Sequence, residues 1–106
     1  MLFFHATLKE NVFNIMRDGL KTGQDGYSYF CKTVEECLMF FKINPLYVGR
    51  QIAVIPIELD ENTVKESDDH NKAYIPADAF CIDYDIPADK IPKRLEKIRL
   101  FEILPK

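Results

Sequence analysis

The sequence predicts an α+β fold in which a small, split, mixed or antiparallel sheet packs on two helices. Apolar residues recur at helical spacing at about 8–18 and 34–42, and both segments lie in the first half of the chain. The other apolar segments are short and rich in Val, Ile and aromatic residues, which is typical of strands. An order of strand, helix, strand, helix and then strands alone favours α+β over a doubly wound α/β fold.

Length and composition predict one domain over residues 1–106, with hydrophobic residues at 47% and aromatic residues at 12%. No apolar run approaches the roughly 20 residues that span a bilayer, and the start lacks the pattern of a signal peptide. We therefore expect a cytoplasmic protein with no membrane partner. The net charge of −3 argues against general affinity for nucleic-acid phosphates.

The N-terminal segment predicts a strand followed directly by a helix. Residues 1–5 are apolar and aromatic and end on a histidine. Thr7 and Glu10 then form a capping-box pattern, in which the hydroxyl accepts from a helix amide and the carboxylate reaches back. Gly19 stands where a left-handed residue ends many helices. We expect a helix at about 8–18 that starts from the Thr7 cap.

A second strand and helix follow. Residues 21–26 contain two glycines and predict a turn, and the aromatic residues 27–31 predict a short strand. A second capping box at Thr33 opens a helix that continues to about Lys42, and Pro45 ends it.

The second half of the chain contains strands and an irregular polar segment. Pro56 predicts that its strand lies near an edge or a bulge. Residues 60–76 are polar and predict a long irregular segment, and residues 85–91 predict a turn or a single helical turn. The strands are expected at 50–59, 79–84 and 95–104.

The cysteines are predicted to be buried small hydrophobic residues in a reducing compartment. Cys31, Cys37 and Cys81 form no CxxC pair, and the chain has only two histidines. Because a zinc site needs such spacing and more ligands, no metal site is predicted.

A polar cluster, Asp68, Asp69 and His70, falls in the irregular segment. Two acids with a histidine are able to bind a metal or to act as acid and base, although their spacing fits no metal signature. A solvated loop is the simpler interpretation.

Four motifs, in this order, resemble the ADP-ribosyltransferase superfamily, in particular its small bacterial and phage members and the RNA 2′-phosphotransferases. They are Phe4-His5-Ala6-Thr7-Leu8-Lys9-Glu10-Asn11, Asp18-Gly19-Leu20-Lys21, Gly26-Tyr27-Ser28-Tyr29-Phe30 and the segment 83–91. The resemblance covers roughly residues 2–42. The resemblance implies an ADP-ribosyltransferase-like fold with NAD bound in a cleft between two small sheets.

The resemblance also implies a division of roles among three motifs. A histidine on the first strand bonds the adenosine-side ribose, a tyrosine on a following strand stacks on nicotinamide, and a glutamate on a later strand holds the nicotinamide ribose. Cleavage of the glycosidic bond develops an oxocarbenium-like cation, which a nearby carboxylate stabilises. In the phosphotransferase relatives the same cleft takes an RNA 2′-phosphate.

Carried onto this sequence, the first motif falls on His5, with Ala6 and Thr7 beside it in the cofactor-binding segment. Tyr27 matches the second motif, and Tyr29 lies two positions later on the same strand face. Either tyrosine is alternatively part of an aromatic core surface, and the capping box already accounts for Thr7.

At the third motif this chain departs from the family, because Asp78 stands where the family has glutamate. The side chain of aspartate is shorter than that of glutamate, but its carboxylate still reaches a ribose that lies close to it. The residues that the resemblance implies for catalysis are His5, Tyr27 and Asp78.

Two functions follow as hypotheses. The first is an NAD-binding ADP-ribosyltransferase-like protein that transfers ADP-ribose to a protein or nucleic-acid target. The second is a catalytically degenerate module of the same fold, which binds a nucleotide or a protein partner and acts as a regulator or inhibitor.

Overall fold

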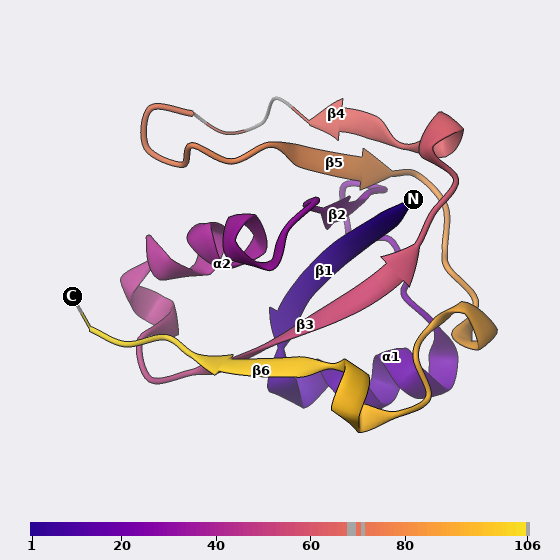
Figure 1. Ribbon diagram of the computed structural model, residues 1–106, viewed down its shortest axis with the longest axis horizontal. Coiled ribbons are helices and arrows are strands. Elements are labelled where there is room, and N and C mark those ends of the chain that lie inside the picture. Colours follow the sequence, from indigo (N-terminus) through magenta and orange to yellow (C-terminus); the bar gives the residue numbers. More distant parts are fainter. Residues whose placement is uncertain (68–69, 71, 106) are drawn as a thin grey trace.

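The computed structural model describes residues 1–67, 70 and 72–105. Two antiparallel three-stranded sheets form the protein (Figure 1). The first sheet has the order β1-β3-β6, with β1 at Leu2–Leu8, β3 at Gln51–Glu58 and β6 at Arg99–Glu102.

The second sheet has the order β2-β5-β4. Its strands are β2 at Ser28–Phe30, β5 at Ala79–Ile82 and β4 at Lys65–Ser67. Helix α1 spans Val12–Asp18 and helix α2 spans Val34–Lys42. The predicted α+β class, with a split sheet and two helices, is confirmed.

Strand β3 is buried on both faces, which explains why its sequence alternates poorly. Ala53 and Ile55 face the core that contains Val12 of α1, whereas Ile52 and Val54 face the core that contains Leu38 of α2. In a strand, successive side chains point to opposite faces, so one apolar run serves two cores.

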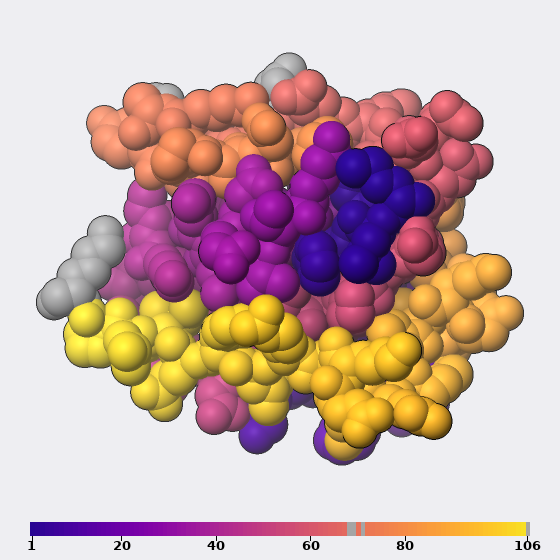
Figure 2. Space-filling view, in the orientation of Figure 1, coloured from indigo at the N-terminus to yellow at the C-terminus, as the bar shows by residue number. Residues whose placement is uncertain are grey.

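On the face drawn in Figure 2, α2 and the start of β1 lie between the C-terminal segment (yellow) and residues of the 70s (orange).

Pro56 lies in a central strand but at a place where only one neighbour pairs. Strand β6 pairs with β3 from Gln51 to Val54, whereas β1 pairs along β3 as far as Glu58. Proline has no N–H and cannot donate a hydrogen bond to a second neighbouring strand. Pro56 lies beyond the last pair with β6, which agrees with the prediction that it lies near an edge.

The prediction that Thr7 caps the first helix is wrong. Thr7 belongs to β1 and pairs with Ala53, and no side chain caps the helix that follows. A 3-10 turn at Lys9–Asn11 precedes α1, and the Thr7 hydroxyl instead accepts from Asn11 Nδ2 at 3.0 Å. The ladder with β3 continues through Leu8, and its backbone hydrogen bonds hold this segment extended.

The second capping box is confirmed in its first half. Thr33 is the N-cap of α2, and its hydroxyl accepts from the amide of Glu36 at 3.2 Å. The Glu36 carboxylate does not reach back to an amide of the cap. It accepts instead from the Thr33 hydroxyl and from the amide of Asp78, so it ties α2 to the start of β5.

The segment 60–76 is more regular than its composition predicts. A 3-10 turn at Glu61–Thr63 leads into β4, a short edge strand whose first two residues are exposed. An edge strand with exposed faces does not need apolar residues, and hydrophobic periodicity therefore misses it. The last strand is likewise shorter than expected, because a 3-10 turn at Leu95–Lys97 precedes β6.

Among the described residues, no helix combines the length and the apolar composition needed to cross a membrane.

Candidate functional site

In the described part of the chain, one backbone bridge joins the two sheets, which then separate. Phe4 and Cys31 exchange two hydrogen bonds, at 2.8 and 2.9 Å. If this antiparallel ladder continued, Ala6 would pair next with Tyr29. Instead, Nδ1 of His5 lies 2.8 Å from the carbonyl oxygen of Tyr29. The imidazole therefore occupies the place of the next ladder bond, and the sheets diverge there.

His5 lies inside β1 and not at its end, which corrects the expected strand boundary. Because a carbonyl only accepts, Nδ1 must carry the proton, and Nε2 of the neutral ring remains an acceptor. Burial lowers the pKa of His5 below its usual value, and the bond to Tyr29 opposes that effect. The ring packs on Phe30 at a centroid distance of 5.4 Å. His5 is thus a fixed, neutral acceptor at neutral pH.

A cavity of about 610 Å³ opens beside this histidine, between the sheets. His5 and Ala6 of β1 line it, together with Tyr27 and Tyr29. Most residues that the resemblance implies for cofactor binding are therefore brought to one place. The volume lies within the range of about 300–1,000 Å³ that is usual for small-molecule sites.

A smaller hollow of about 290 Å³ adjoins it on the α1 side. Thr7, Asn11 and Asn14 give this hollow a polar lining, and it is here that Thr7 is found. His5 and Lys21 line both spaces. An aromatic compartment and a polar compartment thus meet at His5.

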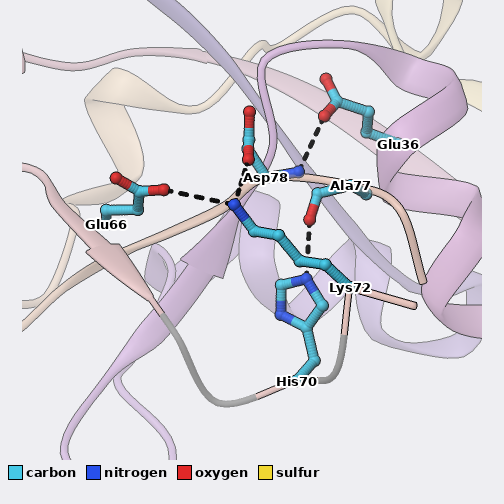
Figure 3. A network of polar contacts seen from close by, with 6 residues as sticks. All are labelled: Glu36, Glu66, His70, Lys72, Ala77 and Asp78. Carbon is cyan, nitrogen blue, oxygen red and sulfur yellow. Dashed lines mark hydrogen bonds and ion pairs between the residues drawn. The ribbon is translucent and has the colours of Figure 1, made fainter. Parts of the chain in front are cut away.

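Asp78 does not join this group. Its carboxylate lies 2.7 Å from Nζ of Lys72, which is also 3.6 Å from Glu66 (Figure 3). The next residue, Ala79, lines the cavity, and Asp78 is absent from the described lining. The bond with Lys72 lowers the pKa of Asp78, so the acid is ionised and paired outside the cavity.

Within the described lining, Asp25 is the acidic residue. Its Oδ2 accepts from the Tyr29 hydroxyl at 2.5 Å, and its Oδ1 accepts from the Tyr27 amide at 3.0 Å. These two bonds lower the pKa of Asp25, the bond from Tyr29 first. The sequence did not single out this residue, because it lies in a turn between glycines.

Sequence reasoning also missed the contribution of α2. Phe40 and Phe41 line the cavity, as do Cys31 and Cys37. All three cysteines are buried, and none of them forms a disulfide. The signal for Phe40 was present, because it widens the apolar stripe of α2 beyond one face, but a stripe cannot distinguish a core from a cavity wall.

His70 closes the cavity on the side of the second sheet. Its Nε2 lies 2.6 Å from the carbonyl oxygen of Ala77, and its ring contacts Phe40 edge to face at 4.8 Å. Asp68 and Asp69, which the sequence grouped with it, lie outside the described residues. In the described part of the chain, no group of three or more His, Cys, Asp or Glu residues is arranged to hold a metal ion.

The perturbed pKa of His5 predicts how stability depends on pH. Below about pH 6.5 the unfolded chain protonates this histidine, whereas the folded chain resists protonation. Stability is therefore complete above that pH and falls as the pH drops, by at most about 1.4 kcal/mol per pH unit. Urea unfolding between pH 7 and 5 measures the slope.

The variant His5→Asn provides the comparison, because its amide nitrogen retains a donor for the Tyr29 carbonyl but does not titrate. We expect a shallower decline for His5→Asn than for the wild type. Parallel declines would show that His5 is protonated as easily in the folded protein as in the unfolded chain.

The arrangement is suited to a flat aromatic ring joined to a hydroxylated group. Aromatic side chains offer ring faces, Nε2 of His5 accepts from a hydroxyl, and Lys21 is the cation of the described lining. Comparison of the chain with protein-family models finds no match, and comparison with curated proteins finds none.

Proposed function

We propose that this protein binds NAD in the cavity between its two sheets, as an ADP-ribosyltransferase-like protein. The observation that supports the proposal best is the convergence of His5, Tyr27 and Tyr29 on one cavity of about 610 Å³. The same residues stand in the motifs that resemble the superfamily, and those motifs are properties of the sequence alone. Three cysteines without a disulfide fit a protein that works in the reducing cytoplasm.

In this proposal the nicotinamide ring lies among the tyrosines and Phe40, and a ribose hydroxyl donates to Nε2 of His5. Since Nδ1 is committed to the Tyr29 carbonyl, the histidine can accept from the ligand but cannot donate to it. The acceptor of the ADP-ribosyl group would be a protein or a nucleic acid.

A second function, nucleotide binding without turnover, is favoured by the position of Asp78. Transfer requires a carboxylate close to the cationic ribose. Asp78 is held by Lys72 outside the described lining, and Asp25 already accepts two hydrogen bonds. Such a module would act as a nucleotide-dependent regulator or inhibitor of a partner.

Calorimetric titration with NAD tests the proposal. We expect the wild type to bind, and His5→Asn to bind about five- to tenfold more weakly because one hydrogen bond is lost. Tyr27→Ala removes a stacking face and should weaken binding to a similar degree. Tyr74→Ala is the matched control, because Tyr74 is 75% exposed and lines neither cavity.

Failure of the wild type to bind NAD at millimolar concentration would rule the proposal out, and equal affinity in all variants would rule out this site. Nicotinamide release then separates the two functions. Release that disappears in Asp78→Asn would support transfer, whereas binding without any release would support the regulator.

A further inference from the structure

The turn before β2 connects both candidate tyrosines to one carboxylate. Asp25 accepts from the Tyr29 hydroxyl with one oxygen and from the Tyr27 amide with the other. The first of these bonds, at 2.5 Å, falls in the range of charge-assisted O–H···O⁻ bonds. One side chain therefore fixes the ring of one tyrosine and the backbone of the other.

Backbone bonds hold the turn that presents Asp25. The Gly23 amide donates to the Tyr27 carbonyl at 2.9 Å, and the Gly26 amide donates to the Gly23 carbonyl at 3.0 Å. Gly26 has a φ of 85°, a conformation that glycine adopts without strain. The carboxylate is thus attached to a closed turn and not to a loose loop.

The tyrosines need such a restraint. Tyr27 is 37% exposed and Tyr29 is 36% exposed, so the packed core covers only part of each side chain. A large side chain that is ordered only when a ligand arrives costs binding about 0.5–1.5 kcal/mol. A side chain that is already fixed avoids this cost.

We propose that Asp25 is the positioning residue of the cavity: it holds the Tyr29 ring as a preformed wall against which a flat aromatic ring stacks. The inference rests on the proposed function and specifies which part of the ligand contacts the Tyr29 ring. Because the proton of the Tyr29 hydroxyl is directed to Asp25, the tyrosine offers the ligand its ring face. The group recognised at this wall is a planar heteroaromatic ring and not a phosphate.

A double-mutant cycle on NAD affinity tests the proposal, with the variants Asp25→Ala, Tyr29→Phe and both together. Loss of the restraint corresponds to about a three- to tenfold weaker affinity. We expect each single variant to show it and the double variant to be no weaker than Asp25→Ala, because both substitutions remove the same bond. Asp25→Asn retains an acceptor oxygen and should recover part of the affinity.

Asp60→Ala is the matched control. Asp60 Oδ1 accepts from the Asn62 amide at 3.0 Å, which is the same local bond that Asp25 makes to Tyr27, but Asp60 lines neither cavity. It should lower stability without changing NAD affinity. A similar loss of affinity in Asp60→Ala would indicate general destabilisation and overturn the positioning role.

A ligand-free measurement separates this proposal from the proposed function. Near-ultraviolet circular dichroism reports how firmly tyrosine rings are held, and Asp25→Ala should weaken this signal because it releases the Tyr29 ring. If Asp25→Ala binds NAD as the wild type does, the positioning role is wrong and the function stands. If the wild type binds no NAD, the function fails, and the circular dichroism of Asp25→Ala decides whether Asp25 holds Tyr29. Loss of nicotinamide release at unchanged affinity would also overturn the role, in favour of direct contact with the substrate.

Discussion

Replacing Gly19 by alanine should lower the free energy of unfolding by at least about 3 kcal/mol, one of the two largest effects expected in this chain. Gly19 ends α1 with a φ of 86° and a ψ of 178°. This region of conformational space is almost confined to glycine, and its occupation by another residue costs about 1–3 kcal/mol. The backbone alone thus accounts for part of the loss.

A collision adds the remainder. A Cβ at Gly19 would lie 2.2 Å from the carbonyl oxygen of Ile86 and 3.0 Å from the amide nitrogen of Ala88. Those atoms cannot move away cheaply, because Leu20 and Ile86 exchange two hydrogen bonds of 2.9 Å and both are buried. The added methyl must break this bridge or shift the end of α1.

Gly49→Ala is the matched control for the collision. Gly49 has a φ of 80°, but a Cβ there would have no atom within 4 Å. Gly49→Ala should therefore lower the free energy of unfolding only by the conformational cost. Urea unfolding followed by circular dichroism compares the two variants. Equal losses would show that the close approach of residues 86–88 to α1 carries no energy.

The sequence predicts those parts of the fold in which one local signal acts without competition. Thr33 caps α2 and Gly19 ends α1 because each choice is made by neighbouring residues in the chain. Thr7 shows the limit: its local pattern favours a helix, but pairing with Ala53, more than forty residues away, keeps it in a strand. Strand β4 was missed for the related reason that its partner β5, and not its own composition, makes it a strand.

The candidate site divides in the same way. His5, Tyr27 and Tyr29 were identified because each stands in a short motif that resembles one of the superfamily, and such motifs are readable from neighbouring residues alone. Asp78 was placed by order along the chain, and order does not say to which side of a strand a carboxylate points or that Lys72 will bind it. Asp25 carried no signal, because its role depends on two bonds that exist only after the turn has closed.

Replacing Phe30 by alanine should cost about 3–5 kcal/mol, the usual loss for a fully buried aromatic ring. Phe30 is 1% exposed, belongs to the core that α1 covers, and also lines the cavity. The space left by the ring would open into the existing cavity. We therefore do not expect neighbouring side chains to move in and fill it. Thermal and urea unfolding measure the loss, which for a chain of this size corresponds to a fall in Tm of more than about 12 °C.

Phe13→Ala is the matched control, because the same ring on α1 is 72% exposed and should lose no more than about 0.5 kcal/mol. Phe30 also supports the His5 ring, whose bond to Tyr29 marks the divergence of the sheets. Removing the phenyl ring frees that imidazole, so the acid decline in stability that His5 produces should become shallower in Phe30→Ala. A large loss of stability with an unchanged pH profile would mean that Phe30 stabilises the core without holding His5, and that the Tyr29 carbonyl alone fixes the histidine.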